Sequence, residues 1–204
     1  MKIIKIGRGH IAHAAMVLTT AFKQDPIFRF IFGNAATYQC AAPWLFASWI
    51  KWAVLFGEAW ITEGGDAVVI TRKIGDARMS FLTMIRAGML PTPFKLGWHA
   101  FHRFYFKVLP VLDKNHERIM GTTPHLYGWM IGATATGEGM ARPLFNFIRG
   151  IADERQLPIF LETANGTNLS LYDHFGFRIV GQEVIAGDCT VYFLVRQPQT
   201  KEVQ

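Results

Sequence analysis

The sequence predicts an α/β fold of the mixed α+β type, with a central mixed, mostly antiparallel sheet flanked by helices. From His125 onward, β-rich runs alternate with segments of helical spacing, which is typical of helices packed on a sheet. Gly64-Gly65 separates two further β-rich runs. With 204 residues, half of them hydrophobic and 18% charged, the chain suits one domain with its own core. We expect this domain over residues 1–197 and a flexible tail at 198–204.

The first 72 residues predict a strand, two helices and a hairpin. A short strand at 2–6 opens the chain. Apolar residues between Ile11 and Phe22 recur at i, i+3, i+4 and i+7, which predicts a helix that ends at Asp25-Pro26. Residues 44–56 are apolar nearly all round, which is typical of a buried helix or of one packed on two partners. Gly64-Gly65 predicts the turn of a β-hairpin.

An aromatic-rich segment follows the hairpin. Helical stretches at Met79–Leu90 and Lys95–Leu109 are interrupted by Pro91 and Pro93. The sequence therefore predicts a helical insertion at about 79–120, which forms a lid or wall over one end of the sheet.

The C-terminal half has the most regular pattern. Gly176 is typical of a helix end, because glycine tolerates the left-handed conformation found there. We expect, in order, a strand at 125–133, a turn at 137–139, a helix at 140–151, a strand at 158–163, a short helix that stops at Gly176, and strands at 177–185 and 190–195.

Charge and composition narrow the function classes. The net charge of +6 favours an anionic partner, but the basic residues form no concentrated stripe, so we expect no nucleic acid. The uncharged stretch 31–50 contains Asn34 and Pro43 and makes a poor membrane span, so we expect no membrane partner. Two cysteines give no disulfide framework, which favours a cytoplasmic protein. His99 and His102 lack a third ligand, so we expect no metal.

Thr136-Gly137-Glu138-Gly139-Met140-Ala141 lies between a predicted strand and a helix start. Two glycines allow a ligand to approach the backbone, and a helix start presents unpaired N–H groups that suit a phosphate. The pattern matches neither a dinucleotide fingerprint nor a P-loop. The alternative is an ordinary strand-to-helix turn.

Asn168 and Tyr172 form a second candidate site within Leu161–Phe177. Their i, i+4 spacing places an amide and a phenol on one helix face, where they could hold a polar ligand and donate a proton. The alternative is that Asn168 caps the helix and Tyr172 is a half-buried core residue.

Together these stretches, from about His125 to Val195, resemble the GNAT superfamily of acetyl-CoA-dependent N-acetyltransferases. The series Leu161-Glu162-Thr163, Asn168, Leu171-Tyr172 and Phe175-Gly176-Phe177 carries most of the resemblance. The glycine motif departs from the family pattern, because Thr136 stands where Gln or Arg is usual. The resemblance implies that the strands carrying Ile131 and Phe160 separate and that the cofactor enters between them.

The resemblance also implies roles for individual residues. Tyr172 would stand near the thioester sulfur as general acid, and Asn168 would touch the pantetheine. Backbone groups would bind the rest of acetyl-CoA: the pantetheine at Ile131, Gly132 and Ala133, and the pyrophosphate at Gly137, Glu138, Gly139, Met140 and Ala141.

The implied reaction is direct attack of an amine on the thioester in a ternary complex. Cys40 and Cys189 have no evident partner base, so a thiol nucleophile is not expected. A base must take a proton from the ammonium, and Glu162, His125 or a water chain are the candidates. The insertion favours a small amine with an apolar part as the acceptor.

Two further possibilities remain open at this level. The departure at Thr136 leaves room for a non-catalytic acyl-CoA-binding or sensor protein of the same fold. The apolar segment 44–56 and an exposed sheet edge make a homodimer an expectation.

Overall fold

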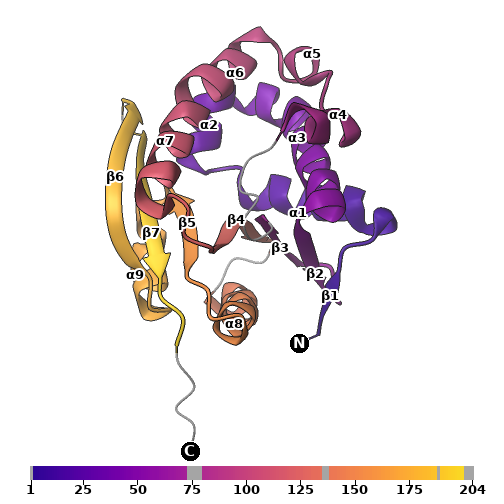
Figure 1. The fold of residues 1–204 in the computed structure, drawn as a ribbon. Helices are drawn as coiled ribbons and strands as arrows, with labels where there is room; N and C mark the ends of the chain where they lie inside the picture. Colours follow the sequence, from indigo (N-terminus) through magenta and orange to yellow (C-terminus); the bar gives the residue numbers. More distant parts are fainter. Residues whose placement is uncertain (1, 73–79, 135–137, 188, 200–204) are drawn as a thin grey trace, which may run out of the picture.

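A single seven-stranded sheet organises the chain (Figure 1). The computed structural model describes residues 2–72, 80–134, 138–187 and 189–199, with only the helical backbone given for 138–141. The strands are β1 (Ile3–Lys5), β2 (Glu58–Thr62), β3 (Ala67–Arg72), β4 (Leu126–Ala133), β5 (Ile159–Thr163), β6 (Arg178–Ala186) and β7 (Cys189–Arg196).

The sheet order is β1-β2-β3-β4-β5-β7-β6, and among the strands of the described residues only β4 and β5 are parallel neighbours. This confirms the predicted mixed, mostly antiparallel sheet. The β2–β3 hairpin also forms as predicted, and Gly65 adopts a φ of 75° in its turn. The parallel pairing of β4 with β5 ends at Gly128 and Leu161, whereas β4 continues to pair with β3 as far as Ala133. The two central strands therefore separate toward their C-terminal ends.

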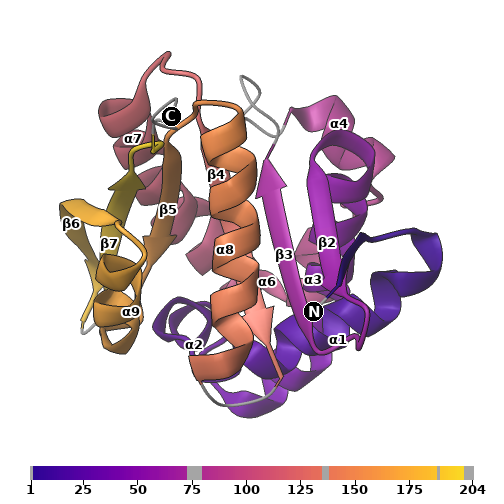
Figure 2. The ribbon, with the colours of Figure 1, turned by 90° about the horizontal axis from the view of Figure 1, so that it is seen from below.

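Helices cover both faces of the sheet. In Figure 2, α8 crosses one face in front of β4, and α1 and α3 lie on the other. The α-helices are α1 (Ile11–Ala21), α2 (Pro26–Phe32), α3 (Ala35–Phe56), α4 (Phe81–Arg86), α5 (Thr92–Leu96), α6 (Trp98–Arg103), α7 (Leu109–Met120), α8 (Glu138–Glu154) and α9 (Leu169–His174). Shorter helical turns are η1 (Arg8–His10), η2 (Phe104–Val108) and η3 (Gly166–Asn168).

The N-terminal helices differ from the sequence prediction in two respects. Asp25 does more than end the first helix: its carboxylate accepts the backbone N–H groups of Ile27 and Phe28, so Asp25-Pro26 begins α2. The apolar helix predicted at 44–56 begins nine residues earlier, because Asn34 caps α3 and Pro43 is accommodated within it.

The predicted insertion is helical and lies between β3 and β4. It comprises α4, α5, α6, η2 and α7, and its buried residues join the core around α3. In Figure 1, α5 and α6 lie at the end of the molecule opposite α8.

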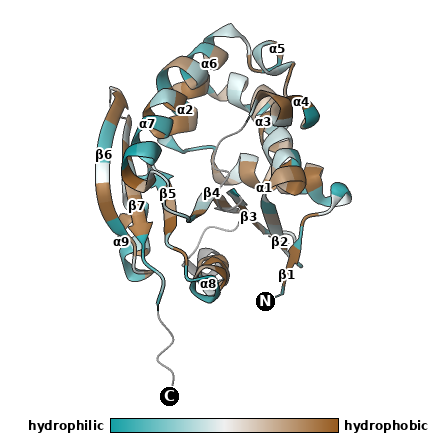
Figure 3. Ribbon diagram, in the orientation of Figure 1, coloured by the Kyte–Doolittle hydropathy of each residue, from teal (hydrophilic) through white to brown (hydrophobic). Residues whose placement is uncertain are grey.

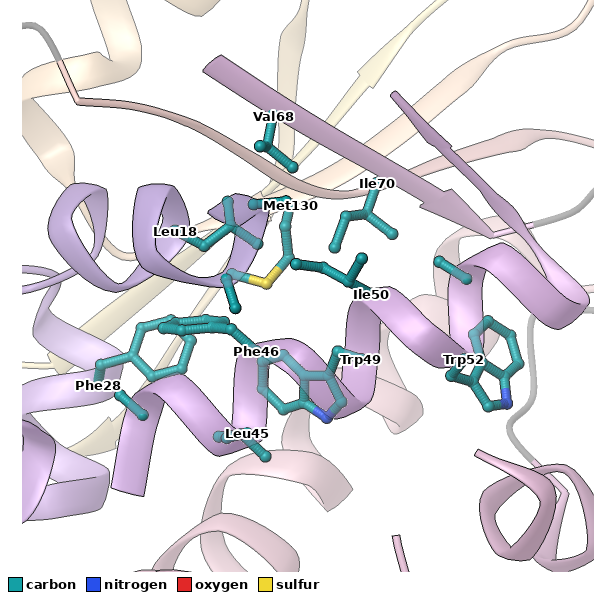
Figure 4. Close-up of a cluster of buried hydrophobic side chains, with 14 of the residues drawn as sticks. Leu18, Phe28, Leu45, Phe46, Trp49, Ile50, Trp52, Val68, Ile70 and Met130 are labelled. Carbon is teal, nitrogen blue, oxygen red and sulfur yellow. The ribbon is translucent and has the colours of Figure 1, made fainter. Parts of the chain in front are cut away.

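Two large apolar clusters hold these layers together. Figure 4 shows side chains of α1, α2, α3, β3 and β4 meeting in the first, where the rings of Phe28 and Phe46 lie 5.1 Å apart. The second packs α8 and α9 on the opposite face of the sheet. Buried Arg196 of β7 forms two hydrogen bonds, of 2.8 and 2.9 Å, with Asp153 of α8. Hydropathy along the ribbon shows that α4–α7 combine hydrophobic and hydrophilic residues (Figure 3).

Because most of α3 is buried within this core, segment 44–56 offers little apolar surface to a second copy, although Leu55 is 48% exposed. The homodimer stays a prediction that rests on the sheet edge at β6, where Ile179, Val180 and Val184 are exposed. No helix within the described residues is long and apolar enough to cross a membrane.

Candidate active site

A cavity of about 520 Å³ lies where β4 and β5 separate. Its walls come from Gly128–Ala133 of β4, Leu161–Asn165 at the end of β5, the segment between α1 and α2, and residues of the insertion. The cavity therefore joins the gap between the central strands to the space beneath the insertion. A volume of this size is typical of a small-molecule site.

Ile131, Gly132 and Ala133 line the cavity at the part of β4 that has no partner in β5. Their backbone groups on that side are available to an extended ligand, which would take the place of a neighbouring strand. Gly132 also has a packing role: a Cβ there would lie 2.9 Å from the Cβ of Ala21, so glycine permits the close approach of α1.

The predicted phosphate-binding motif coincides with the start of α8. The helix begins at Glu138, so Glu138 and Gly139 belong to its first turn instead of the predicted preceding turn. The first four residues of a helix, here Glu138–Ala141, have N–H groups without intrahelical partners. Gly137 lies outside the described residues.

Glu162 lies on β5 with its carboxylate in the cavity wall. The Tyr127 hydroxyl on β4 donates a short hydrogen bond to Oε2. Oε1 is buried and has no hydrogen-bond partner among the described residues. Burial raises the pKa of Glu162 from 4.5 to about 7, and the hydrogen bond from Tyr127 and the charge of Arg72 only partly oppose the rise.

Arg72 is buried at the end of β3, between two aromatic rings. Its guanidinium carbon lies 4.7 Å from the ring centre of Tyr127 and 4.8 Å from that of Trp129. Asp113 of α7 also lines the cavity, and its charge raises the pKa of Glu162 while that of Arg72 lowers it. The surroundings of Glu162 thus combine charges of both signs.

Asn168 and Tyr172 both line the cavity, and their roles toward a ligand stay a prediction. Asn168 lies at the start of α9 but makes no side-chain capping hydrogen bond. Burial and the charge of Asp25 raise the pKa of the Tyr172 phenol to about 12, against a hydrogen bond with Thr163 that lowers it. The phenol therefore stays protonated at neutral pH.

The structure separates the other candidate base from this site. The Nε2 atoms of His125 and His116 are 2.7 Å apart, and His125 Nδ1 lies 2.7 Å from the carbonyl oxygen of Thr123. Both ring nitrogens are thus engaged in structural hydrogen bonds, and burial lowers the pKa of His125. His125 is not among the residues that line the cavity. Within the described part of the chain, no three His, Cys, Asp or Glu side chains group as metal ligands.

Among the polar residues of the cavity that sequence reasoning missed are Asp25, Arg72, Asp113 and Tyr127. Each comes from an element distant in sequence from Glu162, so no local spacing connects them. Asp25-Pro26 carried a usable signal, because Asp before Pro is a strong start for a helix. Arg72 ends β3 and Tyr127 lies near the start of β4. The sheet places these strands side by side and pairs the two residues directly.

We compared the sequence and the fold with those of known proteins. No family model matches the sequence. A Schizosaccharomyces pombe protein named as an uncharacterized N-acetyltransferase is 24% identical over 200 residues, which covers 92% of this chain and 80% of that protein.

Two solved structures extend the comparison over nearly the whole chain. One is a Corynebacterium glutamicum protein described as histone acetyltransferase HPA2 and related acetyltransferase. It has a TM-score of 0.65 at 16% identity, over 99% of this chain and 98% of that one. The other is a Drosophila melanogaster polyamine N-acetyltransferase, with a TM-score of 0.63 at 12% identity, over 96% of this chain and 100% of that one.

The protein has the GNAT acetyltransferase fold. The resemblance predicted from the sequence is confirmed, and the GNAT architecture extends beyond the C-terminal half to the whole sheet. The relative and the structural neighbours are named as acetyltransferases, which supports an N-acetyltransferase enzyme.

Proposed function

We propose that this protein transfers an acetyl group from acetyl-CoA to the amine of a small acceptor, by direct attack in a ternary complex. The observation that carries the proposal is the position of Glu162. Its buried, unpartnered Oε1 belongs to a carboxylate on a cavity that joins the gap between β4 and β5 to the space beneath the insertion. A base at this junction can serve a reaction between two ligands that enter from different sides.

The gap suits the thioester substrate. The unpaired edge of β4 at Ile131–Ala133 would hold the pantetheine arm, with Asn168 beside it. The N–H groups of Glu138–Ala141 and the positive end of the α8 dipole would face the pyrophosphate. Acetyl-CoA supplies the activated acyl group, and the protein orients it.

Glu162 is the proposed general base. A carboxyl group with a pKa of about 7 is largely ionised just above neutral pH, yet it still binds a proton readily. It would take a proton from the acceptor ammonium, directly or through water, while Tyr127 holds the other carboxylate oxygen. The free amine then attacks the thioester carbonyl carbon, the new C–N bond forms, and the C–S bond breaks.

Tyr172 is the proposed general acid, because its phenol is protonated throughout the neutral range and lines the same cavity. It would donate a hydrogen bond or a proton to the departing CoA sulfur. Thr163 orients the phenol through their hydrogen bond.

The walls of the cavity indicate the acceptor class. Three residues with carboxyl groups, Asp25, Asp113 and Glu162, and one with a guanidinium, Arg72, line the cavity, which suits a cation. Apolar and aromatic side chains form much of the remaining surface beneath the insertion, including Trp49, Phe104, Tyr105, Met84 and Met89. A small ammonium with an apolar part fits better than a long peptide, and the Drosophila neighbour is likewise named for a cationic acceptor.

Calorimetric titration with acetyl-CoA, paired with thiol release over a panel of amines, tests the proposal. The panel contains phenethylamine, putrescine and a short lysine-rich peptide. We expect acetyl-CoA to bind and a small amine to release CoA. Binding without release by any amine would favour the alternative of a non-catalytic acyl-CoA-binding protein. No binding at millimolar acetyl-CoA would overturn the cofactor assignment.

A further inference from the structure

Many of the large exposed apolar side chains belong to the insertion. Of the twelve large hydrophobic residues exposed in the described part of the chain, seven belong to this segment. We define the outer apolar face as Phe81, Leu82, Ile85, Leu90, Phe94, Trp98 and Phe106. Phe94 is 88% exposed and Leu82 is 72% exposed, which is unusual for such large groups.

These side chains are not needed by the core or the cavity. The inward positions of the same segment, among them Ala87, Leu96, Ala100 and Val108, are already buried in the core around α3. Other residues of the insertion, such as Met84 and Phe104, line the cavity. The insertion is therefore apolar on both its inner and its outer side.

Part of the outer apolar face is a continuous aromatic group along α6 and η2. The ring centres of Trp98 and Phe101 are 5.8 Å apart, and those of Phe101 and Phe106 are 6.2 Å apart. The His102 ring lies 5.3 Å from that of Phe106. Tryptophan and phenylalanine beside basic groups are the combination that favours the boundary between lipid headgroups and acyl chains.

The part of the insertion that carries the outer apolar face, before α7, has charged residues of one sign. From Ser80 to Leu112 the sequence contains no Asp or Glu. Arg86, Lys95 and Lys107 are exposed in the same helices, together with His99 and His102. Apolar helices that carry Lys and Arg but no acidic residue are complementary to an apolar phase bordered by anions.

We propose that the outer apolar face docks the protein on the surface of an anionic lipid bilayer. Phe94 and Trp98 would enter the headgroup region, and Lys95 and Lys107 would contact lipid phosphates and carboxylates. A second copy is a poorer occupant, since a symmetric contact would bring two faces of the same positive charge together. The expectation of no membrane partner rested on the lack of a spanning segment, and a surface-bound protein needs none.

Docking would have a consequence for the cavity. α4 and η2 carry part of the outer apolar face and also line the cavity, through Met84 and Phe104 among others, so the bound protein would hold its cavity close to the lipid surface. An amine with an apolar part concentrates at such a surface. The docking proposal itself does not depend on acetyl transfer.

Sedimentation with vesicles tests the proposal on the full chain. We expect binding to phosphatidylcholine vesicles that contain phosphatidylserine, little binding to pure phosphatidylcholine, and weakening by salt. Vesicles with brominated acyl chains should quench the fluorescence of Trp98, which is 65% exposed, whereas Trp49, Trp52 and Trp60 are buried. Trp98→Phe should remove most of that quenching.

Matched variants distinguish vesicle binding through the outer apolar face from nonspecific hydrophobic adsorption. Phe94→Ser/Trp98→Ser should abolish vesicle binding, whereas Met16→Ser/Leu55→Ser removes two exposed apolar groups on α1 and α3 and should leave it unchanged. Lys95→Glu/Lys107→Glu should weaken binding about tenfold or more. Circular dichroism and melting temperature verify that each variant is folded.

Two results would overturn the proposal. One is absence of binding to anionic vesicles by the folded parent. The other is equal loss in both pairs of serine variants. If the parent does not bind vesicles but forms dimers, and Phe94→Ser/Trp98→Ser makes it monomeric, the outer apolar face would be a contact between two copies of the chain instead.

Discussion

Replacing Glu162 with Gln is expected to stabilise the protein at alkaline pH, although the residue is proposed to be essential for activity. The folded protein raises the pKa of this carboxyl group from 4.5 to about 7. It therefore binds the proton more tightly than the unfolded chain does. The contribution of Glu162 to stability is greatest below about pH 4.5 and is lost as the pH rises through 7.

The size of the effect on stability follows from the shift in the pKa of Glu162. A rise from 4.5 to about 7 corresponds to at most about 3 kcal/mol between fully protonated and fully ionised protein. The amide of the Glu162→Gln variant would have no proton to lose, and its oxygen can still accept the Tyr127 hydroxyl. Any packing cost of the new amide is the same at every pH, so the informative quantity is how the difference between parent and variant changes with pH.

Urea unfolding of the parent and Glu162→Gln at pH 5, 6, 7 and 8 measures this difference. We expect the free energy of unfolding of the variant, relative to that of the parent, to increase progressively from pH 5 to pH 8. Glu154→Gln, at an exposed position on α8, is the control for removing a charge as such. Parallel stability curves for the parent and Glu162→Gln would refute the conclusion that the cavity holds a destabilised carboxylate.

Three other substitutions test separate parts of the site. Tyr172→Phe should keep CoA affinity within about twofold but lower turnover at least about tenfold, because a positioned acid typically contributes roughly 10²–10⁴-fold; unchanged turnover would exclude the phenol as general acid. Gly139→Asp should weaken CoA binding at least about tenfold through repulsion of pyrophosphate. An acidic residue in the first turn of α8 favours the helix, so the variant should stay folded. A fall in melting temperature that matches the loss of binding would contradict repulsion of pyrophosphate as the cause. Gly132→Ala should cost about 1–3 kcal/mol in urea unfolding, because the new Cβ would lie 2.9 Å from Ala21 on α1; unchanged stability would contradict that packing role.

Local spacing was sufficient to predict much of the C-terminal half. Alternation and helical periodicity located β4, β5 and α8, and the i, i+4 relation placed Asn168 and Tyr172 on one cavity. These features depend on neighbours in sequence.

The parts that sequence failed to predict depend on contacts between distant segments. The environment of Glu162 arises because β3 and β4 bring Arg72 and Tyr127 beside β5. The start of α3 lies before the predicted helix at 44–56, because the surrounding aromatic core sustains the helix through Pro43. The role of Asp25 as a cavity carboxylate requires the fold of α1 and α2 together.

The pH dependence of acetyl transfer tests the proposed function most directly. Once an acceptor amine is identified, kcat/KM is measured from pH 5.5 to 9 for the parent and for Glu162→Gln. For the parent we expect kcat/KM to rise through an apparent pKa near 7, the value to which burial raises the carboxyl group. The variant should be slower by about 100-fold or more and lack that rise, while both share any later rise from the amine itself. Equal rates with the same profile in both proteins would contradict a catalytic role for Glu162.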